Sequence, residues 1–457
     1  MLHSVRRELP PMLRLATPIV AAEIGWMTMA VVDTMMVGRL PNSADAIGAV
    51  SLGSILFYAV AIFGTGMMLG LDTLVSHAFG AGRIEDCHHS LYNGVYLSLG
   101  MGPLLMGAIW LWPFALQRMR IDRNVLTLAT PYLNALNWGL FPLLLFFVFR
   151  RYLQAINRAA PVMFALISAN LVNLFGDYAL IYGHFGARAM GAVGSGWATA
   201  ISRMYMAIVL LGYIIYNDHR HQTGLREVSG RPNFRRIRHL VSLGVPAGAQ
   251  LTIEVGVFAA AAALIAKLGA IPLASHQIAL NTASFTYMVP LGIGSAAAVR
   301  VGHALGRGDV AAARLSGWTA IGLGGAFMSC MAVAFWTVPH WIVRIFTPDE
   351  RIMESATVLL FVAAFFQLFD GLQAVATGAL RGTGDTRTPM ICHGAGYWVI
   401  GLPLGYLLCF HFKYGAPGMW TGLCLALILI GIALFLAWHR KARRNFDLPL
   451  AAVHQTE

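Results

Sequence analysis

The sequence predicts an all-α membrane protein of about twelve transmembrane helices. Three observations predict this fold: 58% of the 457 residues are hydrophobic, only 11% are charged, and apolar stretches recur along nearly the whole chain. A soluble domain carries roughly 25% charged residues, and a helix needs about 20 apolar residues to cross a bilayer. The composition therefore does not fit a water-soluble fold or a sizeable soluble domain.

Hydropathy places the expected helices in two groups of equal size. We expect them near residues 15–38, 46–72, 90–112, 127–150, 160–183 and 190–216, and then near 240–267, 273–299, 314–337, 354–380, 388–411 and 416–439. This division predicts an N-terminal lobe at 1–216, a cytoplasmic linker loop at 217–239, and a C-terminal lobe with a basic tail at 240–457.

The two halves also repeat each other at an offset of about 228 residues. Pro18 corresponds to Pro246, and VSHAFGAG (Val75–Gly82) corresponds, after a two-residue slip, to VGHALGRG (Val301–Gly308). Because each half crosses the membrane an even number of times, both halves enter it in the same direction. A pseudo-twofold axis along the membrane normal should therefore relate them, with a cavity between. This architecture suits alternating access, although a duplicated scaffold or a channel stays open at this point.

The net charge of +12 is explained by topology. Lys and Arg concentrate at both termini and in alternate loops, as the positive-inside rule requires of cytoplasmic segments. We therefore expect a multi-pass protein of the cell (inner) membrane with both termini in the cytoplasm. Anionic membrane lipid is the expected neighbour of the basic central loop, and no nucleic-acid partner is implied.

The sequence offers little support for an enzyme. It contains no CxxC pair and no HExxH, and none of its lysines precedes Ser or Thr as a Walker A motif requires. We therefore expect no disulfide framework, no zinc site, no cofactor and no direct use of ATP. The oligomeric expectation is a monomer.

Acidic residues inside the apolar segments are the strongest functional signal. On insertion scales each costs roughly 2.5–3.5 kcal/mol, so each needs a water-filled cavity, a partner or a bound cation. The clear cases are Glu23, Asp33, Asp177, Glu254 and Asp370. Asp72 lies near a helix end, where we expect a solvated or capping role.

Asn173 and Asp177 form the first candidate site. Their spacing of four places both on one helix face and offers oxygen ligands of the kind that sodium prefers. Asp33, from another helix, could complete the set. The alternative is that Asn173 merely holds Asp177 in a protonated state.

A second acidic pocket is expected in the C-terminal half. Glu254 follows Gln250 by one turn, and Asp370 shares a helix with Phe366 and Gln373. The Phe366 ring could offer its face to a cation, although an aromatic residue at helical spacing is more often a plain packing residue.

Polar residues on one further helix extend this pocket. Gln277, Asn281 and Ser284 form a stripe on an otherwise apolar segment, which we expect to face a cavity. The acids do not follow the repeat: at the offset of about 228 residues, Asp33 meets Ala261 and Glu254 meets Trp26. The scaffold is symmetric, whereas the chemistry is not. Arg203, within a predicted span, needs a carboxylate or a cavity.

Several stretches together resemble the multidrug and toxic compound extrusion family, in particular its NorM-type bacterial branch. The stretches that carry the resemblance are LATPIV (Leu15–Val20), VVDTMMVGRL (Val31–Leu40), Glu254–Gly269, SHQIALN (Ser275–Asn281), RVGHALGRGD (Arg300–Asp309) and LRGTGDTRTP (Leu380–Pro389). They lie in both halves of the chain.

The resemblance implies a two-lobed antiporter that exports lipophilic, often cationic drugs in exchange for sodium or protons. It also implies residue roles: Asp33, Asn173, Asp177 and Thr199 look like a cation site of the N-terminal lobe, and Glu254 with Asp370 looks like an acidic pair of the C-terminal lobe. Phe366 stands where some relatives have tyrosine, which removes direct hydroxyl coordination. A flippase for a lipid-linked saccharide is the alternative of the same architecture, but its cavity should be lined by arginines.

Overall fold

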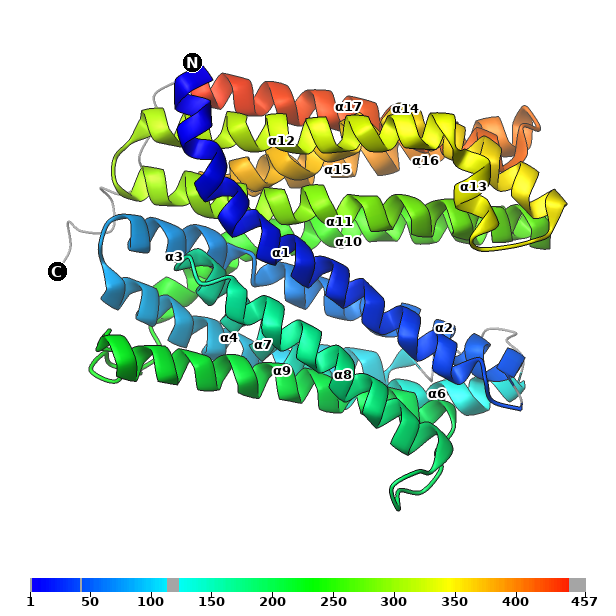
Figure 1. Ribbon diagram of the computed structural model, residues 1–457, viewed down its shortest axis with the longest axis horizontal. Helices are drawn as coiled ribbons and strands as arrows, with labels where there is room; N and C mark the ends of the chain where they lie inside the picture. Colours follow the sequence, from blue (N-terminus) through cyan, green and yellow to red (C-terminus); the bar gives the residue numbers. More distant parts are fainter. Residues whose placement is uncertain (1, 42, 113–122, 444–457) are drawn as a thin grey trace. The chain divides into compact units, whose positions relative to one another are not determined.

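The computed structural model describes residues 2–41, 43–112 and 123–443, and all regular structure in this part is helical (Figure 1). The helices of the first half are α1 (Leu2–Val37), α2 (Ser43–Met67), α3 (Gly70–Gly80), α4 (Ile84–Trp110), α6 (Arg123–Trp138), α7 (Leu140–Ala155), α8 (Ala160–Tyr182) and α9 (Ala192–His221). Those of the second half are α10 (Phe234–Ile265), η1 (Ala266–Leu268), α11 (Ala270–Gly306), α12 (Val310–Thr337), α13 (Pro339–Arg344), α14 (Glu350–Gly382), α15 (Arg387–His393), η2 (Gly394–Gly401), α16 (Leu402–Tyr406), η3 (Leu407–His411) and α17 (Gly415–Arg443).

The helix lengths confirm an all-α protein that crosses the membrane many times. Ten of the described helices are long and apolar enough to span a bilayer, and an eleventh span results if the α6–α7 pair, bent by 41°, counts as one. Helix α4 has 27 residues, which is also a spanning length, but its first turn carries Glu85 and Asp86. Each range expected from hydropathy overlaps a described helix.

Several helices continue well beyond the apolar segment that predicted them. Helix α1 begins at Leu2 rather than near residue 15, and α11 continues to Gly306. Hydropathy measures only the part of a helix that suits lipid, whereas backbone hydrogen bonding continues into the polar ends.

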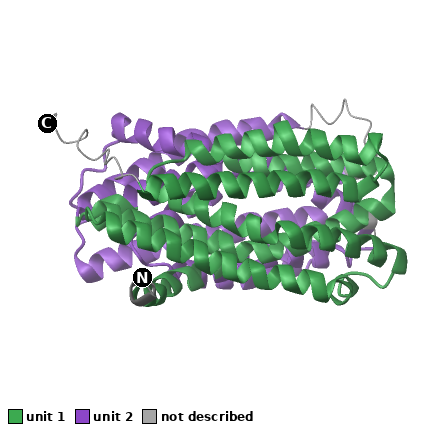
Figure 2. Ribbon diagram, turned by 90° about the horizontal axis from the view of Figure 1, so that it is seen from above, with its two compact units in different colours: residues 1–20, 76–82, 249–457 green, residues 21–75, 83–248 purple. Residues whose placement is uncertain are grey.

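The chain divides into two compact units (Figure 2). Unit 1 consists of residues 1–20, 76–82 and 249–457, and unit 2 consists of residues 21–75 and 83–248. Helices α1, α3 and α10 therefore contribute residues to both units. The lobe boundaries expected from the sequence remain a prediction, and the end of the basic tail, 444–457, lies outside the described residues.

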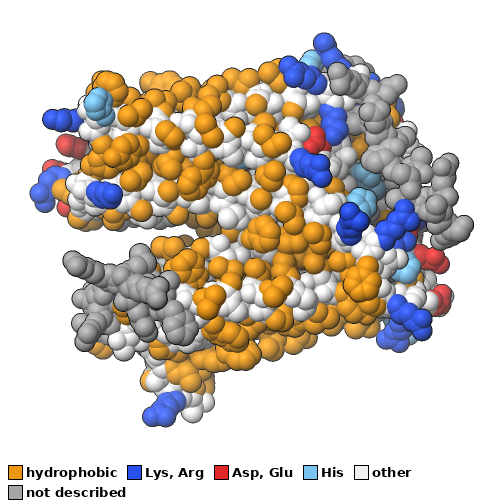
Figure 3. Space-filling view, turned by 180° about the vertical axis from the view of Figure 1, so that it is seen from behind, with side chains coloured by type: hydrophobic (Ala, Val, Ile, Leu, Met, Phe, Trp, Pro, Cys, Tyr) orange, Lys and Arg blue, Asp and Glu red, His pale blue; other side chains and the backbone are white. Residues whose placement is uncertain are grey.

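The surface is divided in the way that a bilayer requires. On the face in Figure 3, hydrophobic side chains cover the middle of the helices, and Lys and Arg side chains gather toward the helix ends. Charged ends and an apolar middle keep costly charges out of the hydrocarbon layer.

Corresponding helix ends in the two repeats have the same local structure. Helix α3 ends before Gly82, whose φ is +75°, and α11 ends before Gly308, whose φ is +77°. The Ala81 N–H donates to the His77 carbonyl, and the Arg307 N–H donates to the His303 carbonyl. Glycine is required at both ends because the left-handed backbone disfavours a Cβ.

Close helix contacts in unit 1 depend on glycine. Helices α11 and α14 pack together along their length, and a Cβ added to Gly378 would collide with the backbone carbonyl of Gly294. A backbone atom cannot rotate away as the end of a side chain can. Small residues at such contacts let membrane helices approach closely.

We expect Gly378→Ala to destabilise the protein by about 1–3 kcal/mol, because α11 and α14 must separate to admit the methyl group. The measurement is the midpoint of thermal unfolding of the purified protein in detergent. Gly322→Ala in α12 is the matched control, since a Cβ there meets nothing within 4 Å. Equal midpoints for both variants would show that the close contact is not required.

Candidate functional site

Unit 2 brings together the four residues of the first candidate site. Asp33 lies on α1, Asn173 and Asp177 on α8, and Thr199 on α9, and each side chain is buried. The Thr199 hydroxyl donates to Asp33 Oδ2 at 2.9 Å. The Asp33 carboxyl also interacts with the side chains of Asp177 and Asn173. Three helices therefore converge on one acidic cluster.

Ser195 joins this cluster and was missed by the sequence interpretation. It lies one turn before Thr199 on α9, is fully buried, and interacts with Asp177. The signal was available, because a spacing of four on a helix places two hydroxyls on one face. Its role was hidden because serine in an apolar helix is commonly bonded to its own backbone.

Many oxygens of the acidic cluster have no hydrogen-bond donor within the described part of the chain. They are Asp33 Oδ1, both carboxyl oxygens of Asp177, Asn173 Oδ1 and Ser195 Oγ. Two carboxylates cannot hydrogen-bond to each other unless one carries a proton, because neither has a donor. The cluster therefore fits a proton or a hard cation, which would bind to carboxylate, amide and hydroxyl oxygens.

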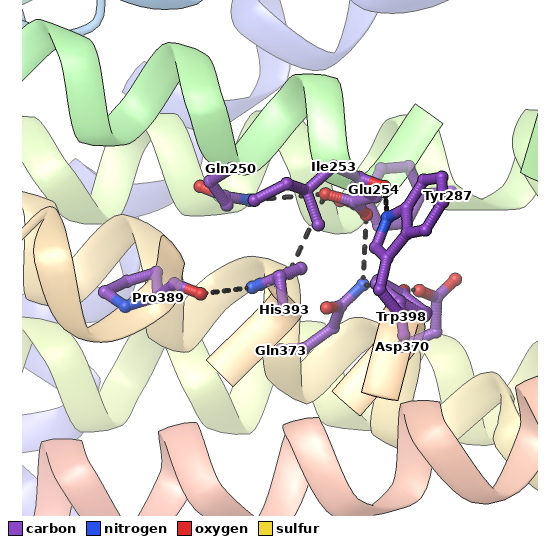
Figure 4. A network of polar contacts seen from close by, with 10 residues as sticks. Gln250, Ile253, Glu254, Tyr287, Asp370, Gln373, Pro389, His393 and Trp398 are labelled. Carbon is purple, nitrogen blue, oxygen red and sulfur yellow. Dashed lines mark hydrogen bonds and ion pairs between the residues drawn. The ribbon is translucent and has the colours of Figure 1, made fainter. Parts of the chain in front are cut away.

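Unit 1 builds the second acidic site around Glu254 of α10 (Figure 4). Its Oε2 accepts from the Gln250 amide, and its Oε1 accepts from the Tyr287 hydroxyl and the Gln373 amide, each at 3.2 Å. The same Gln373 amide nitrogen donates to Asp370 Oδ1 at 3.0 Å. One amide thus bridges the two acids, and Glu254 has a shell of donors that Asp177 does not have.

His393 adds a further contact to Glu254 that the sequence did not predict. Its Nδ1 must donate to the Pro389 carbonyl, 2.7 Å away, because a carbonyl oxygen only accepts. This leaves Nε2 directed at Glu254 Oε2, at 3.7 Å (Figure 4). At this distance a proton on Nε2 would give an ion pair with the Glu254 carboxylate, not a hydrogen bond.

A π-helical segment begins immediately after His393. Residues Gly394–Gly401 form η2, which places Tyr397 beside His393 with ring centroids 5.7 Å apart. π-helical turns often occur at functional sites. Their positions cannot be deduced from hydropathy, which explains why Tyr397 and His393 were missed.

The remaining predicted C-terminal residues lie apart from this hydrogen-bonded network. Phe366 is buried, and its ring stacks on Trp420 with centroids 5.9 Å apart. Gln277 and Asn281 are exposed on α11, and neither is among the described residues that hydrogen-bond to Glu254 or Asp370. Their roles remain predictions.

Two other acids are fixed by arginine in unit 2. Glu23 forms a buried ion pair with Arg150 of α7. Asp72 is 1% exposed and lies 3.6 Å from Arg151. The expectation that Asp72 is solvated is therefore wrong, because tertiary packing covers the helix end that carries it. Glu23 has a permanent partner, so it differs from Asp33 although both lie on α1.

Comparison with known proteins agrees with this geometry. The MatE family model matches residues 18–179 and 246–407. The chain belongs to the MatE family. The two matched segments begin at Pro18 and Pro246, the pair that marks the repeat in the sequence, so the duplication is confirmed.

Other MatE proteins match this chain over nearly its whole length. A probable multidrug resistance protein NorM of Pseudomonas syringae is 35% identical over 450 residues, covering 96% of each chain. Multidrug resistance protein MdtK of Edwardsiella ictaluri is 32% identical over 459 residues, covering 98% of this chain and 99% of its own.

Solved structures of transporters share the fold of this MatE protein. The eukaryotic MATE transporter AtDTX14 superposes with a TM-score of 0.85 at 22% identity, covering 97% of this chain and 99% of its own. The Vibrio cholerae MATE transporter VcmN, in its bent form, gives a TM-score of 0.81 at 16% identity, covering 97% of this chain and 99% of its own. These matches confirm the two-lobed all-α fold class.

In this MatE protein, we expect Glu23→Gln to cost about 3–5 kcal/mol of stability, because it leaves the Arg150 guanidinium buried without its counter-charge. The loss should be measured as a lower thermal unfolding midpoint in detergent. The double variant Glu23→Gln/Arg150→Met removes both charges and should recover most of that loss. A single variant as stable as the wild type would contradict a structural role for the pair.

Proposed function

We propose that this MatE protein is a secondary active multidrug exporter. It would expel lipophilic, often cationic organic compounds in exchange for sodium or protons by alternating access. The names of its relatives, NorM and MdtK, support this function, as does family membership over both halves. The family is one of transporters rather than enzymes, and no further cofactor is proposed.

The observation that carries the proposal is the state of the Asp33–Asp177 cluster. A structural carboxyl in an apolar interior is normally satisfied by an ion pair or by donors, as Glu23 and Glu254 are. Asp177 is fully buried, yet among the described residues neither of its carboxyl oxygens has a donor in hydrogen-bond geometry within 3.5 Å. Such an arrangement is costly unless a proton or a cation occupies it for part of the cycle.

The two acidic sites would divide the work. Binding of the coupling ion at Asp33 and Asp177 would stabilise one facing state, and the drug would bind the other state more tightly. A ligand shifts such an equilibrium only by its difference in affinity between the two states. The donor-rich Glu254–Asp370 site would then bind a cationic drug or a second coupling ion.

We further propose the cellular setting from the charge pattern. Two groups of basic residues support a cytoplasmic position for both termini of an inner-membrane protein: Arg6 and Arg7 near one end of α1, and Arg440, Lys441 and Arg443 at the end of α17. The proposed partners are small drug-like molecules and anionic lipid, and the proposed state is a monomer.

A flippase for a lipid-linked saccharide fits less well. Its cavity needs arginines free to hold pyrophosphate. Here Arg150 is paired with Glu23, Arg151 lies beside Asp72, and Arg203 lies over an aromatic ring. Within the acidic cluster itself, the ionisable groups are the carboxyls of Asp33 and Asp177, which would repel a pyrophosphate.

Transport by proteoliposomes tests the proposal directly. We expect uphill movement of a fluorescent organic cation when a sodium gradient or a pH gradient is imposed, and the effective gradient identifies the coupling ion. Asp33→Asn and Asp177→Asn should each lower the initial rate at least about tenfold, and Glu254→Gln and Asp370→Asn should also lower it, because each removes a charge that the cycle uses.

Glu354→Gln is the matched control, since Glu354 is exposed on α14, the helix that carries Asp370. Its rate should equal that of the wild type. Wild-type export by a protein bearing all four neutral substitutions would refute the coupling mechanism.

A further inference from the structure

Arg203 is a buried cation beside the acidic cluster, and the proposed function does not yet account for it. It lies on α9, and its side chain is 1% exposed. Its guanidinium carbon lies 4.5 Å from the centre of the Phe57 ring, and Nη2 donates to the Tyr58 hydroxyl at 3.3 Å. Nε and Nη1 have no hydrogen-bond partner within the described part of the chain. Ring faces therefore replace the carboxylate that a buried arginine usually has.

The position of Arg203 links it to Asp33. Arg203 follows Thr199 by one turn of α9, and the Thr199 hydroxyl donates to Asp33. The guanidinium is close enough to interact electrostatically with Asp33. No ion pair within 4.0 Å joins the two among the described residues, however. Arg203 thus contributes its field to the acidic cluster without occupying the ligand positions.

The charges of this group can be counted. Asp33 and Asp177 contribute two negative charges when ionised, and Arg203 contributes one positive charge that no accessible pH removes. The remaining balance is one negative charge. A single monovalent cation neutralises it, whereas a divalent cation would leave a net positive charge in a buried site.

The ligand atoms alone do not produce this preference. Carboxylate, amide and hydroxyl oxygens are also the ligands of calcium. Asn173 is fully buried, and its amide oxygen has no hydrogen-bond partner in residues 2–41, 43–112 and 123–443, so an oxygen ligand beyond the two carboxyls is available. Without Arg203, the acidic cluster would offer two carboxylates and neutral oxygens, which is the composition of a divalent site.

We infer that Arg203 is the charge-selectivity residue of the acidic cluster and restricts it to one monovalent cation by excluding divalent cations. This inference rests on the proposed function, because it takes Asp33 and Asp177 as the cation site. In this role Arg203 acts through its charge on the acidic cluster, and neither through contact with a drug nor through helix packing.

Calcium binding to the purified protein in detergent tests the inference. With ⁴⁵Ca²⁺ as the probe, the wild type and Arg203→Lys should show no saturable site, because both keep the positive charge. Arg203→Gln and Arg203→Met should each gain one site, at least about tenfold tighter than any wild-type binding. Adding Asp33→Asn or Asp177→Asn to either variant should abolish the gain.

Tyr58→Phe is the matched control for local packing. It removes the hydroxyl that contacts Arg203 but keeps the charge, so it should gain no calcium site. A monodisperse gel-filtration peak confirms folding of each variant, and Arg203→Met retains an apolar side chain over Phe57 should Arg203→Gln be unstable. Two results would overturn the inference. One is calcium binding by the wild type that Asp177→Asn abolishes, and the other is the absence of a new calcium site in folded Arg203→Gln and Arg203→Met.

These results are separable from those on export, since the binding assay uses no drug and no gradient. Suppose that export depends on Asp33 and Asp177 but that loss of Arg203 creates no calcium site. This outcome would support the proposed function and reject the selectivity role of Arg203. Suppose instead that loss of Arg203 creates a calcium site that Asp33→Asn abolishes, while export is unchanged by substitution of either acid. This outcome would reject the proposed function.

Discussion

The cost of burying a charged group in a low-dielectric interior is the constraint on which the rest of this structure depends. Buried acidic residues of this chain have three kinds of surroundings. Glu23 pairs with Arg150, and Glu254 is surrounded by amide and hydroxyl donors. Asp177, in contrast, has carboxyl oxygens that no donor in the described chain satisfies. The Glu23–Arg150 pair stabilises the fold, whereas Asp177 leaves room for the proposed coupling ion. Buried acidic residues thus differ in role because their surroundings differ.

The repeat shows how a symmetric scaffold supports asymmetric chemistry. The equivalent helix ends at Gly82 and Gly308 have nearly the same φ, because both repeats need the same left-handed cap. The acids are not repeated in this way. At the position of Glu254, the first repeat has Trp26, whose ring packs against Phe146 and Phe147. A position that packs against aromatic rings in one half is acidic in the other, so the two halves share a backbone but not the chemistry of this position.

Hydropathy predicted the fold, and helical spacing predicted that Asn173 and Asp177 share one face of a helix. The family resemblance, not the spacing, implied that Asp33 joins them from another helix. The partners from distant helices could not be predicted. The contact of Tyr287 with Glu254 depends on how α10 and α11 pack, and that of His393 on the end of α15 before the π-helical turns. The error at Asp72 has the same origin, since Arg151 lies on another helix. Local sequence reports the cost of a charge but does not identify what offsets it.

Helix α9 carries the residues that can tune the charge and the ligands of the acidic cluster. Asp33 and Asp177 both lie within the first segment that matches the MatE model, 18–179. Helix α9 lies between this segment and the second one, 246–407. Ser195, Thr199 and Arg203 succeed one another at intervals of four, so one face of α9 presents a hydroxyl, a donor to Asp33 and a fixed cation. Changes on this face can alter the net charge and ligands of the site without moving a carboxyl. On the proposed role of Arg203, the acids define where a cation can bind, and α9 determines which cation the site accepts.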